Sequence, residues 1–165
     1  MDLRPELRPP QLDEALVARL ARLADQLDGD RDEEKRSEFN QLAGTDIPMI
    51  EFQGVSGGMS HEEFARRVLY WRLIKPVSDA TREELAEVVR RAMPRNEFFD
   101  EHEAYMAIFE ANVPLEGASN LIYYPPDYDE VTNTWGGGRP LAEYDPSPEQ
   151  IVEWALDPRE SADKD

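Results

Sequence analysis

Residues 81–92 read Thr-Arg-Glu-Glu-Leu-Ala-Glu-Val-Val-Arg-Arg-Ala and contain the signals of an amphipathic helix. The Thr81 hydroxyl can accept a hydrogen bond from a free backbone N–H group, and Glu84 can bond to the N–H group of Thr81 in return. Helical spacing then gives the segment one apolar side, which consists of Leu85, Val88, Val89 and Ala92. We therefore predict a helix that begins at Thr81 and ends before Pro94.

Two further segments begin in the same way, at residues 60–63 (Ser-His-Glu-Glu) and 147–150 (Ser-Pro-Glu-Gln). Each places a hydroxyl at the cap and Glu or Gln three residues later, and Pro148 suits the first helical position because no N–H group is needed there. They predict helices over residues 61–74 and 147–156. The side chains expected to face inward are Phe64, Val68 and Trp71 in the first helix, and Ile151, Val152 and either Trp154 or Ala155 in the second.

The rest of the chain divides into short elements. Leucines at helical spacing predict a helix over residues 12–27, and a second is expected over residues 32–42. Residues 45–59 are irregular, a longer helix is predicted over residues 96–112, and residues 127–146 form a polar loop. The further side chains expected to face inward are Ile47, Ile50, Phe52, Phe98, Tyr105, Met106 and Phe109. Because strand patterns are confined to isolated short pieces, the predicted fold is all-α.

The charge of this 165-residue chain is distributed unevenly, and its formal net charge is −18. Residues 1–76 contain 15 acids and 11 bases, whereas residues 97–157 contain 14 acids and Arg139 as their one base. A nucleic acid is not an expected partner, because phosphate binding requires clustered Lys and Arg. The natural complement is a basic protein or a bound cation, and the alternative is a solvated surface that keeps the protein soluble.

Cysteine is absent, which excludes disulfides, thiolate catalysis and thiolate-bound zinc. No apolar stretch follows Met1 to predict a signal peptide, and no apolar run is long enough to predict a membrane span. We therefore expect a cytoplasmic protein that does not bind membranes.

Few side chains are candidates for catalysis or metal binding. His61 and His102 are the two histidines of the chain. A metal site formed by His102 with Glu101 and Glu103 is disfavoured, because consecutive side chains on a helix do not converge on one point. No nucleophile motif is found, and the glycines at 136–138 lack the Lys-Ser/Thr that follows in a phosphate-binding loop. We expect no enzyme, no cofactor and no metal site.

Residues 119–125, Ser-Asn-Leu-Ile-Tyr-Tyr-Pro, place two tyrosines side by side on a short segment that a proline ends. Adjacent helical side chains diverge by about 100°, so one ring is expected to pack inward and the other to point outward. An exposed tyrosine beside many acids is typical of a contact anchor. The acids predicted on the preceding helix, Asp100, Glu101 and Glu103, have almost no Lys or Arg among them. They form either a contact surface or an ordinary solvated face.

These features together resemble the small four-helix immunity proteins that protect bacteria against DNase-type colicins and pyocins. The resemblance covers residues 81–158. It rests on the capped helix at Thr81, the acidic second helix, residues 117–125 (Gly-Ala-Ser-Asn-Leu-Ile-Tyr-Tyr-Pro) and residues 147–152 (Ser-Pro-Glu-Gln-Ile-Val).

The resemblance implies a compact four-helix domain over residues 79–158. It leaves residues 1–78 as an additional helical region of unknown role, and residues 159–165 are expected to be a disordered tail. An alternative register takes the helix over residues 61–74 as the first of the four and leaves residues 94–118 as an insertion. We prefer the register without an insertion.

The resemblance also implies a binding site. In that family a short third helix presents two tyrosines and a preceding acid to the nuclease domain of the toxin, and the acidic second helix supplies selectivity. The implied anchors here are Tyr123 and Tyr124, flanked by the polar side chains of Ser119 and Asn120. The implied selectivity face consists of Asp100, Glu101, Glu103 and Glu110. Asn120 departs from the family, which has Asp at this place and therefore one more charge-assisted bond.

The expected function is therefore non-enzymatic inhibition, in which the chain binds the basic nuclease domain of a bacteriocin-like toxin and blocks its access to DNA. A second class of function stays open, in which a regulatory or scaffold module binds a cellular partner through residues 1–78. The first 75 residues have no counterpart in the small immunity proteins, and the loop of about twenty residues before the last helix is much longer than theirs. The sequence indicates no oligomeric state.

Overall fold

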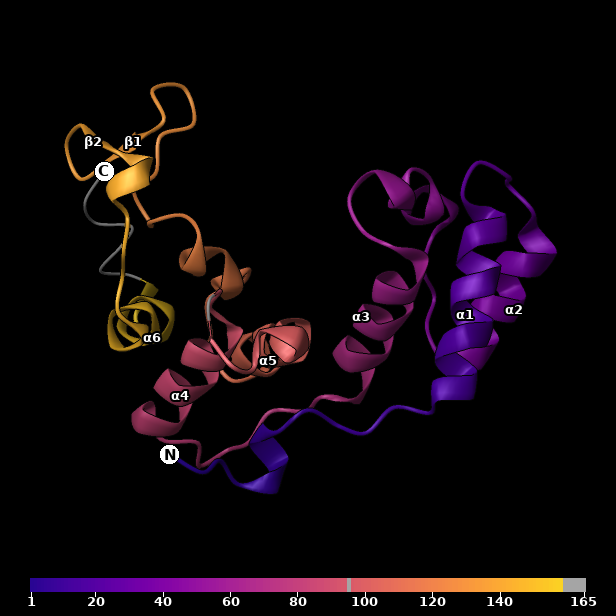
Figure 1. Ribbon diagram of the computed structural model, residues 1–165, viewed down its shortest axis with the longest axis horizontal. Coiled ribbons are helices and arrows are strands. Elements are labelled where there is room, and N and C mark those ends of the chain that lie inside the picture. The colour runs from indigo at the N-terminus through magenta and orange to yellow at the C-terminus, as the bar shows by residue number, and fades with distance from the viewer. Residues whose placement is uncertain (95, 159–165) are drawn as a thin grey trace. The chain divides into compact units, whose positions relative to one another are not determined.

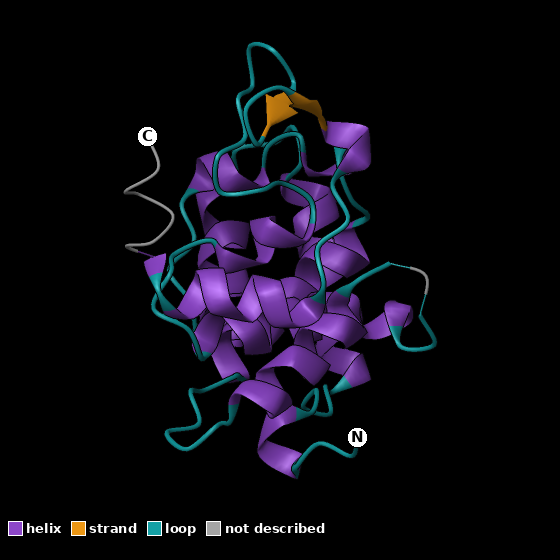
Figure 2. Ribbon diagram, turned by 90° about the vertical axis from the view of Figure 1, so that its left-hand side faces the viewer, coloured by secondary structure: helices purple, strands orange, loops and turns teal. Residues whose placement is uncertain are grey.

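The computed structural model describes residues 1–94 and 96–158, and over these residues the chain is all-α, as predicted (Figure 1). The described part contains six α-helices, several short 3₁₀ helices (η) and one two-stranded sheet (Figure 2). None of the helices in these two ranges is long and apolar enough to cross a lipid bilayer. The tail predicted over residues 159–165 lies outside the described residues.

The chain forms two compact units. The first unit is residues 10–74, and the second unit combines residues 1–9 with the chain from residue 75 onward. The domain boundary predicted after residue 78 therefore lies near the end of the first unit. Residues 1–9 were expected to belong to the N-terminal region, but they pack in the second unit, where Leu3 and Leu7 are buried.

The first unit is a three-helix arrangement. α1 (Glu14–Leu27) contacts both α2 (Glu33–Ala43) and α3 (His61–Leu73). Two 3₁₀ helices, η2 (Met49–Phe52) and η3 (Val55–Gly57), lie in the connection from α2 to α3. The segment predicted to be irregular thus contains local turns that place an aromatic side chain in the core.

Three phenylalanines lie at the centre of the first unit. The ring centroid of Phe52 is 4.9 Å from that of Phe39 and 5.6 Å from that of Phe64, in edge-to-face geometry. Such pairs add about 0.5–1.5 kcal/mol beyond the burial of their area. Phe52 is buried as predicted, whereas Ile50 is 65 % exposed. The two side chains diverge because a 3₁₀ helix completes a turn every three residues.

The helix predicted over residues 61–74 is confirmed as α3, and its capping box is formed. Its inward face is partly different from the prediction. Ala65 and Leu69 are the buried residues, and Trp71 is 40 % exposed. Two adjoining apolar stripes run along this helix, and spacing alone does not determine which of them meets α1.

The second unit is built on α4 (Arg82–Ala92), which contacts α5 (His102–Ala111) and α6 (Pro148–Leu156). The 3₁₀ helix η5 (Ala118–Ile122) follows α5 and contacts both α5 and α6. The remaining elements of this unit are η1 (Pro5–Leu7), η4 (Phe99–Glu101), β1 (Thr134–Trp135), β2 (Arg139–Pro140) and η6 (Leu141–Glu143).

The predicted start of α4 is confirmed in detail. The Glu84 N–H group donates to the Thr81 hydroxyl at 3.1 Å, and the Thr81 N–H group donates to the Glu84 carboxylate at 2.9 Å. The four apolar positions predicted for this helix are buried. The Glu84 carboxylate also accepts a hydrogen bond from the Arg4 guanidinium at 2.8 Å. The helix cap therefore fastens the N-terminal segment to the second unit.

The helix predicted over residues 96–112 begins later, at His102. The Asn96 side chain accepts a hydrogen bond from the Phe98 N–H group at 2.7 Å and donates to the Arg90 carbonyl at 3.0 Å. An asparagine that bonds to the backbone two residues ahead forms a turn that competes with the helix. As a consequence Asp100 and Glu101 belong to η4 and not to α5.

The loop predicted over residues 127–146 contains a β-hairpin. β1 pairs antiparallel with β2, with Thr134 opposite Pro140 and Trp135 opposite Arg139. All three glycines between the strands have positive φ. Only glycine adopts such a run without strain, so these residues suit the tight turn between the two strands.

Candidate functional site

The two tyrosines of the sequence pattern directly follow the buried helix η5. Leu121 and Ile122 of η5 are buried. The Asn120 carbonyl accepts hydrogen bonds from the N–H groups of Tyr123, at 3.0 Å, and Tyr124, at 2.8 Å. These bonds close the turn and fix the backbone at the point where both tyrosines leave the helix.

Both rings are exposed, so the prediction that one of them packs inward is wrong. Tyr123 is 43 % exposed and Tyr124 is 45 % exposed. The expected divergence applies to two residues within a helix, whereas Tyr123 is already the C-terminal cap of η5. Leu121 and Ile122 supply the apolar contacts of this segment in place of a tyrosine ring.

Each tyrosine has a specific neighbour. The ring centroid of Tyr124 lies 4.9 Å from that of Tyr128, with the planes tilted by 44°. Partial burial and, after it, the charge of Glu103 raise the pKa of the Tyr123 hydroxyl. Glu103, on the first turn of α5, is therefore close enough to Tyr123 for an electrostatic interaction.

The other predicted acids of the selectivity face lie at different places. Asp100 and Glu101 are exposed in η4, immediately before α5. Glu110, near the end of α5, accepts hydrogen bonds from both the hydroxyl and the N–H group of Ser119. Because Ser119 is buried, this pair attaches η5 to α5 internally. Asn120 is exposed and lies beside the tyrosines.

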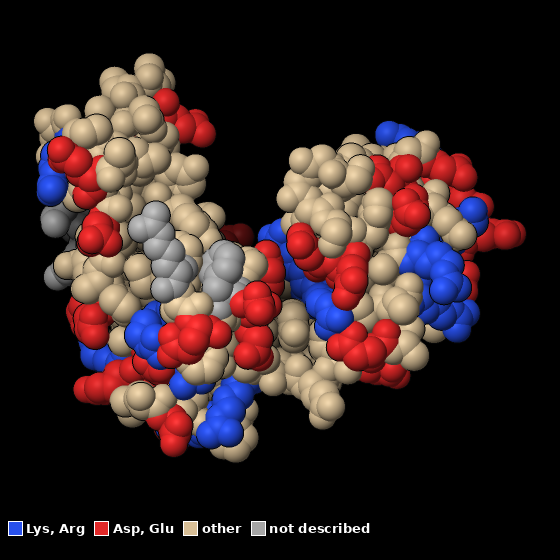
Figure 3. Space-filling view, viewed as in Figure 1, with Lys and Arg blue, Asp and Glu red and all other residues tan. Residues whose placement is uncertain are grey.

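The bases of the second unit are concentrated elsewhere. Within the described ranges Arg4 pairs with Glu84, and Arg90 pairs with Glu87, each at 2.8 Å. No described Lys or Arg forms an ion pair with Asp100 or Glu101. Figure 3 shows most of the visible basic side chains of this unit near α4 and the N-terminal segment, with acids among them, and a further basic side chain beside the hairpin. The carboxylates of Asp100 and Glu101 therefore have no described Lys or Arg as an ion-pair partner, whereas the Glu103 carboxylate lies 3.8 Å from the His102 ring.

Sequence reasoning did not identify Tyr128 as a neighbour of Tyr124. A signal was present, since the two tyrosines are four residues apart across Pro125 and Pro126, which cannot continue a helix. A pair of prolines favours a tight reversal but does not specify which rings meet. That contact depends on the path of the following hairpin.

Among residues 1–94 and 96–158, no group of three or more His, Asp or Glu side chains is arranged to hold a metal ion. Comparisons with protein-family models, with curated proteins and with solved structures find no match to this chain.

Proposed function

We propose that this protein is an immunity-type inhibitor that binds the basic nuclease domain of a bacteriocin-like toxin and blocks its access to DNA. One observation supports the proposal most strongly: two adjacent tyrosines, Tyr123 and Tyr124, are both exposed beside the acidic start of α5. Over residues 97–157 this region contains 14 acids and one base. Two adjacent exposed tyrosine rings in a region rich in acids can bind a basic protein surface.

The acids would act before contact. A nuclease domain that binds DNA presents a positive surface, and opposite fields increase the rate of encounter by about 10–10³-fold at low salt. Asp100, Glu101 and Glu103 would supply this field from η4 and the first turn of α5. Because the same positive surface binds phosphate, the inhibitor would compete directly with DNA.

The tyrosines would act after contact. Tyrosine buries a large area with few rotatable bonds, and such residues dominate the centres of protein interfaces. Here the backbone turn and the Glu110–Ser119 bonds hold the segment before the partner arrives. Ordering costs on binding are then reduced, which favours a slow rate of dissociation.

The test uses the full chain and the nuclease domain of any toxin that a neighbouring gene encodes. We expect stoichiometric loss of DNA cleavage and a nanomolar or tighter Kd that weakens as salt increases. Unchanged cleavage, together with no binding to that active nuclease, would contradict the proposal.

A second candidate function has its own observation in the first unit. Ile50 is 65 % exposed and Trp71 is 40 % exposed. Both line a surface groove of about 620 Å³, together with Met59 and Phe64. Such a groove suits a regulatory or scaffold module that binds through its N-terminal helices. In that case the Trp71→Ala variant would fail to restore the phenotype lost when the gene for this protein is deleted, whereas the Tyr124→Ala variant would restore it.

A further inference from the structure

The hairpin region that follows the tyrosines is held by hydrogen bonds of both its backbone and its side chains. The Asp129 N–H group donates to the Thr134 carbonyl at 2.9 Å, and the Gly136 N–H group donates to the Asp127 carboxylate at 2.8 Å. The indole N–H group of Trp135 donates to the Pro140 carbonyl at 3.2 Å. These bonds indicate an ordered surface segment and not a flexible linker.

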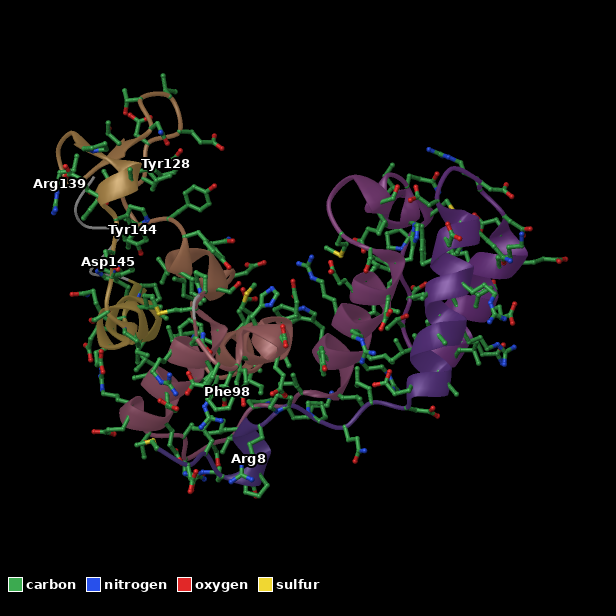
Figure 4. All side chains as sticks on the ribbon, viewed as in Figure 1. Arg8, Phe98, Tyr128, Arg139, Tyr144 and Asp145 are labelled. Carbon is green, nitrogen blue, oxygen red and sulfur yellow. The ribbon has the colours of Figure 1, made fainter. Side chains whose placement is uncertain are left out.

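The hairpin is also fastened to the tyrosine segment. Tyr144, which follows the second strand, donates its hydroxyl to the Leu121 carbonyl of η5. Its ring meets that of Trp135 at 5.4 Å between centroids. On the outer side the Tyr128 ring packs on Tyr124, as described above, and Figure 4 shows Tyr128 and Tyr144 near the base of the hairpin. The hairpin and the tyrosine segment are therefore expected to present a single surface.

From Tyr128 this surface continues into the loop of residues 129–133, which precedes β1. The Tyr128 hydroxyl donates to the Asn133 side chain at 2.7 Å. In this loop Val131 is 94 % exposed, and its N–H group donates to the Asp129 carboxylate at 2.9 Å. A single exposed apolar residue is ordinary. Val131, however, lies at the end of the surface that begins at the exposed Tyr123 and Tyr124 and continues through Tyr128.

The charge of the hairpin specifies the kind of partner. Residues 127–146 contain five acids and a single base, Arg139. The Arg139 guanidinium lies 4.4 Å from the centroid of the Trp135 ring and 3.7 Å from the Glu143 carboxylate. With its base engaged in this way, the hairpin complements a basic protein surface and would repel a second copy of the chain.

We infer that the loop of residues 129–133, which precedes β1 of the hairpin, is a second contact for the basic protein domain that the tyrosines bind. This inference rests on the proposed function, because it assigns a further part of the interface to the same partner. The exposed valine would add apolar contact, and Glu130 beside it would add attraction during encounter. The long loop before α6 would thereby enlarge the binding surface.

The test measures association and dissociation rates of full-length variants with the neighbouring toxin's nuclease domain. Val131→Ser should increase the dissociation rate by about three- to tenfold, as loss of an apolar contact does. Glu130→Lys should lower the association rate by about fivefold or more at low salt. Glu83→Lys is the matched control, because Glu83 is exposed on the first turn of α4, at the opposite end of this unit from the hairpin (Figure 1). It should change either rate by less than about twofold.

The outcomes separate the two proposals. Wild-type rates for both hairpin variants, alongside a weakened Tyr124→Ala variant, would overturn the second contact and leave the proposed function in place. An equal decrease of the association rate in Glu130→Lys and Glu83→Lys would also overturn the second contact. The electric field of the whole molecule would then explain the slower association. If the wild-type chain does not bind, both proposals fail. Because Val131 and Glu130 are exposed, thermal unfolding of their variants should match that of the wild type, whereas Glu83→Lys should melt slightly lower because a positive charge in the first turn opposes the helix dipole.

Discussion

At the scale of single residues, the candidate site separates side chains that hold the surface from side chains that form it. Glu110 and Ser119 were predicted to contact a partner, yet they bond to each other and attach η5 to α5. Tyr123, Tyr124 and Asn120 are exposed on the segment that this pair supports. The two groups of residues should therefore respond differently to substitution.

Tyr124→Ala should weaken binding to the nuclease domain by about 2 kcal/mol or more, as the loss of a central aromatic contact does. Its effect on folding should be small, because the ring is 45 % exposed. Calorimetric titration of the variant, with thermal unfolding as the control, measures both quantities. An unchanged affinity would place the interface elsewhere on the molecule.

Glu110→Ala should lower the free energy of unfolding by about 1–3 kcal/mol, because it leaves the buried N–H and hydroxyl groups of Ser119 without their acceptor. Affinity should fall as well, since η5 would no longer be held against α5. Chemical denaturation of Glu110→Ala beside Glu116→Ala, an exposed neighbour, checks the first expectation. Equal stability of the two variants would argue against an internal role for Glu110.

At the scale of elements, the predictions from sequence were strongest where a local signal specifies the structure. The starts of α3, α4 and α6 were predicted correctly, because a hydroxyl cap and the residues after it act within one turn. The start of α5 was wrong because Asn96 forms a turn that a pattern of apolar residues does not reveal. The exposure of both tyrosines was missed because it depends on where η5 ends.

Side chains of α4 also join elements that lie far apart in the sequence. The buried Arg91 donates to the Glu87 carboxylate at 3.0 Å, to the Tyr105 hydroxyl of α5 at 3.0 Å and to the Met1 carbonyl at 2.9 Å. Hydrogen bonds from Arg90 and, to a lesser extent, Arg91 lower the pKa of Glu87 to about 2. The ionised form of Glu87 is thus favoured by folding.

This shift gives stability a dependence on pH. Because the folded pKa is below the unfolded value of about 4.3, Glu87 should stabilise the fold fully above about pH 5 and progressively less as the pH falls toward 2. The difference in Tm between wild type and Glu87→Gln should therefore be largest near neutral pH and shrink in acid. A difference that stays constant between pH 7 and pH 3 would contradict this role.

At the scale of the whole molecule, the second unit is discontinuous in sequence, which composition and spacing did not predict. Leu3 and Leu7 are buried in it, and Arg4 pairs with Glu84 and Asp79. The sequence offers no local sign that residues 1–9 belong with the chain from residue 75 onward. Such a contact joins segments about seventy residues apart and depends on tertiary packing.

Truncation tests this organisation. Leu7→Ala in the full chain should lower the free energy of unfolding by about 2–5 kcal/mol, as other buried leucine truncations do. A fragment that begins at residue 79 should melt at a lower temperature than the corresponding transition of the full chain. The exposed neighbour Glu6 supplies a control, because Glu6→Ala removes a side chain that faces solvent. If Leu7→Ala proves as stable as Glu6→Ala, the N-terminal segment does not complete this unit.

The central claim is that the acidic surface around Tyr123 and Tyr124 binds a basic nuclease domain. Titration of the full chain with the nuclease domain of the neighbouring toxin, at low and at high salt, tests it most directly. The account predicts a nanomolar or tighter complex at low salt that weakens as salt screens the opposed charges. No binding at low salt, or binding that salt and Tyr124→Ala both leave unchanged, would contradict it.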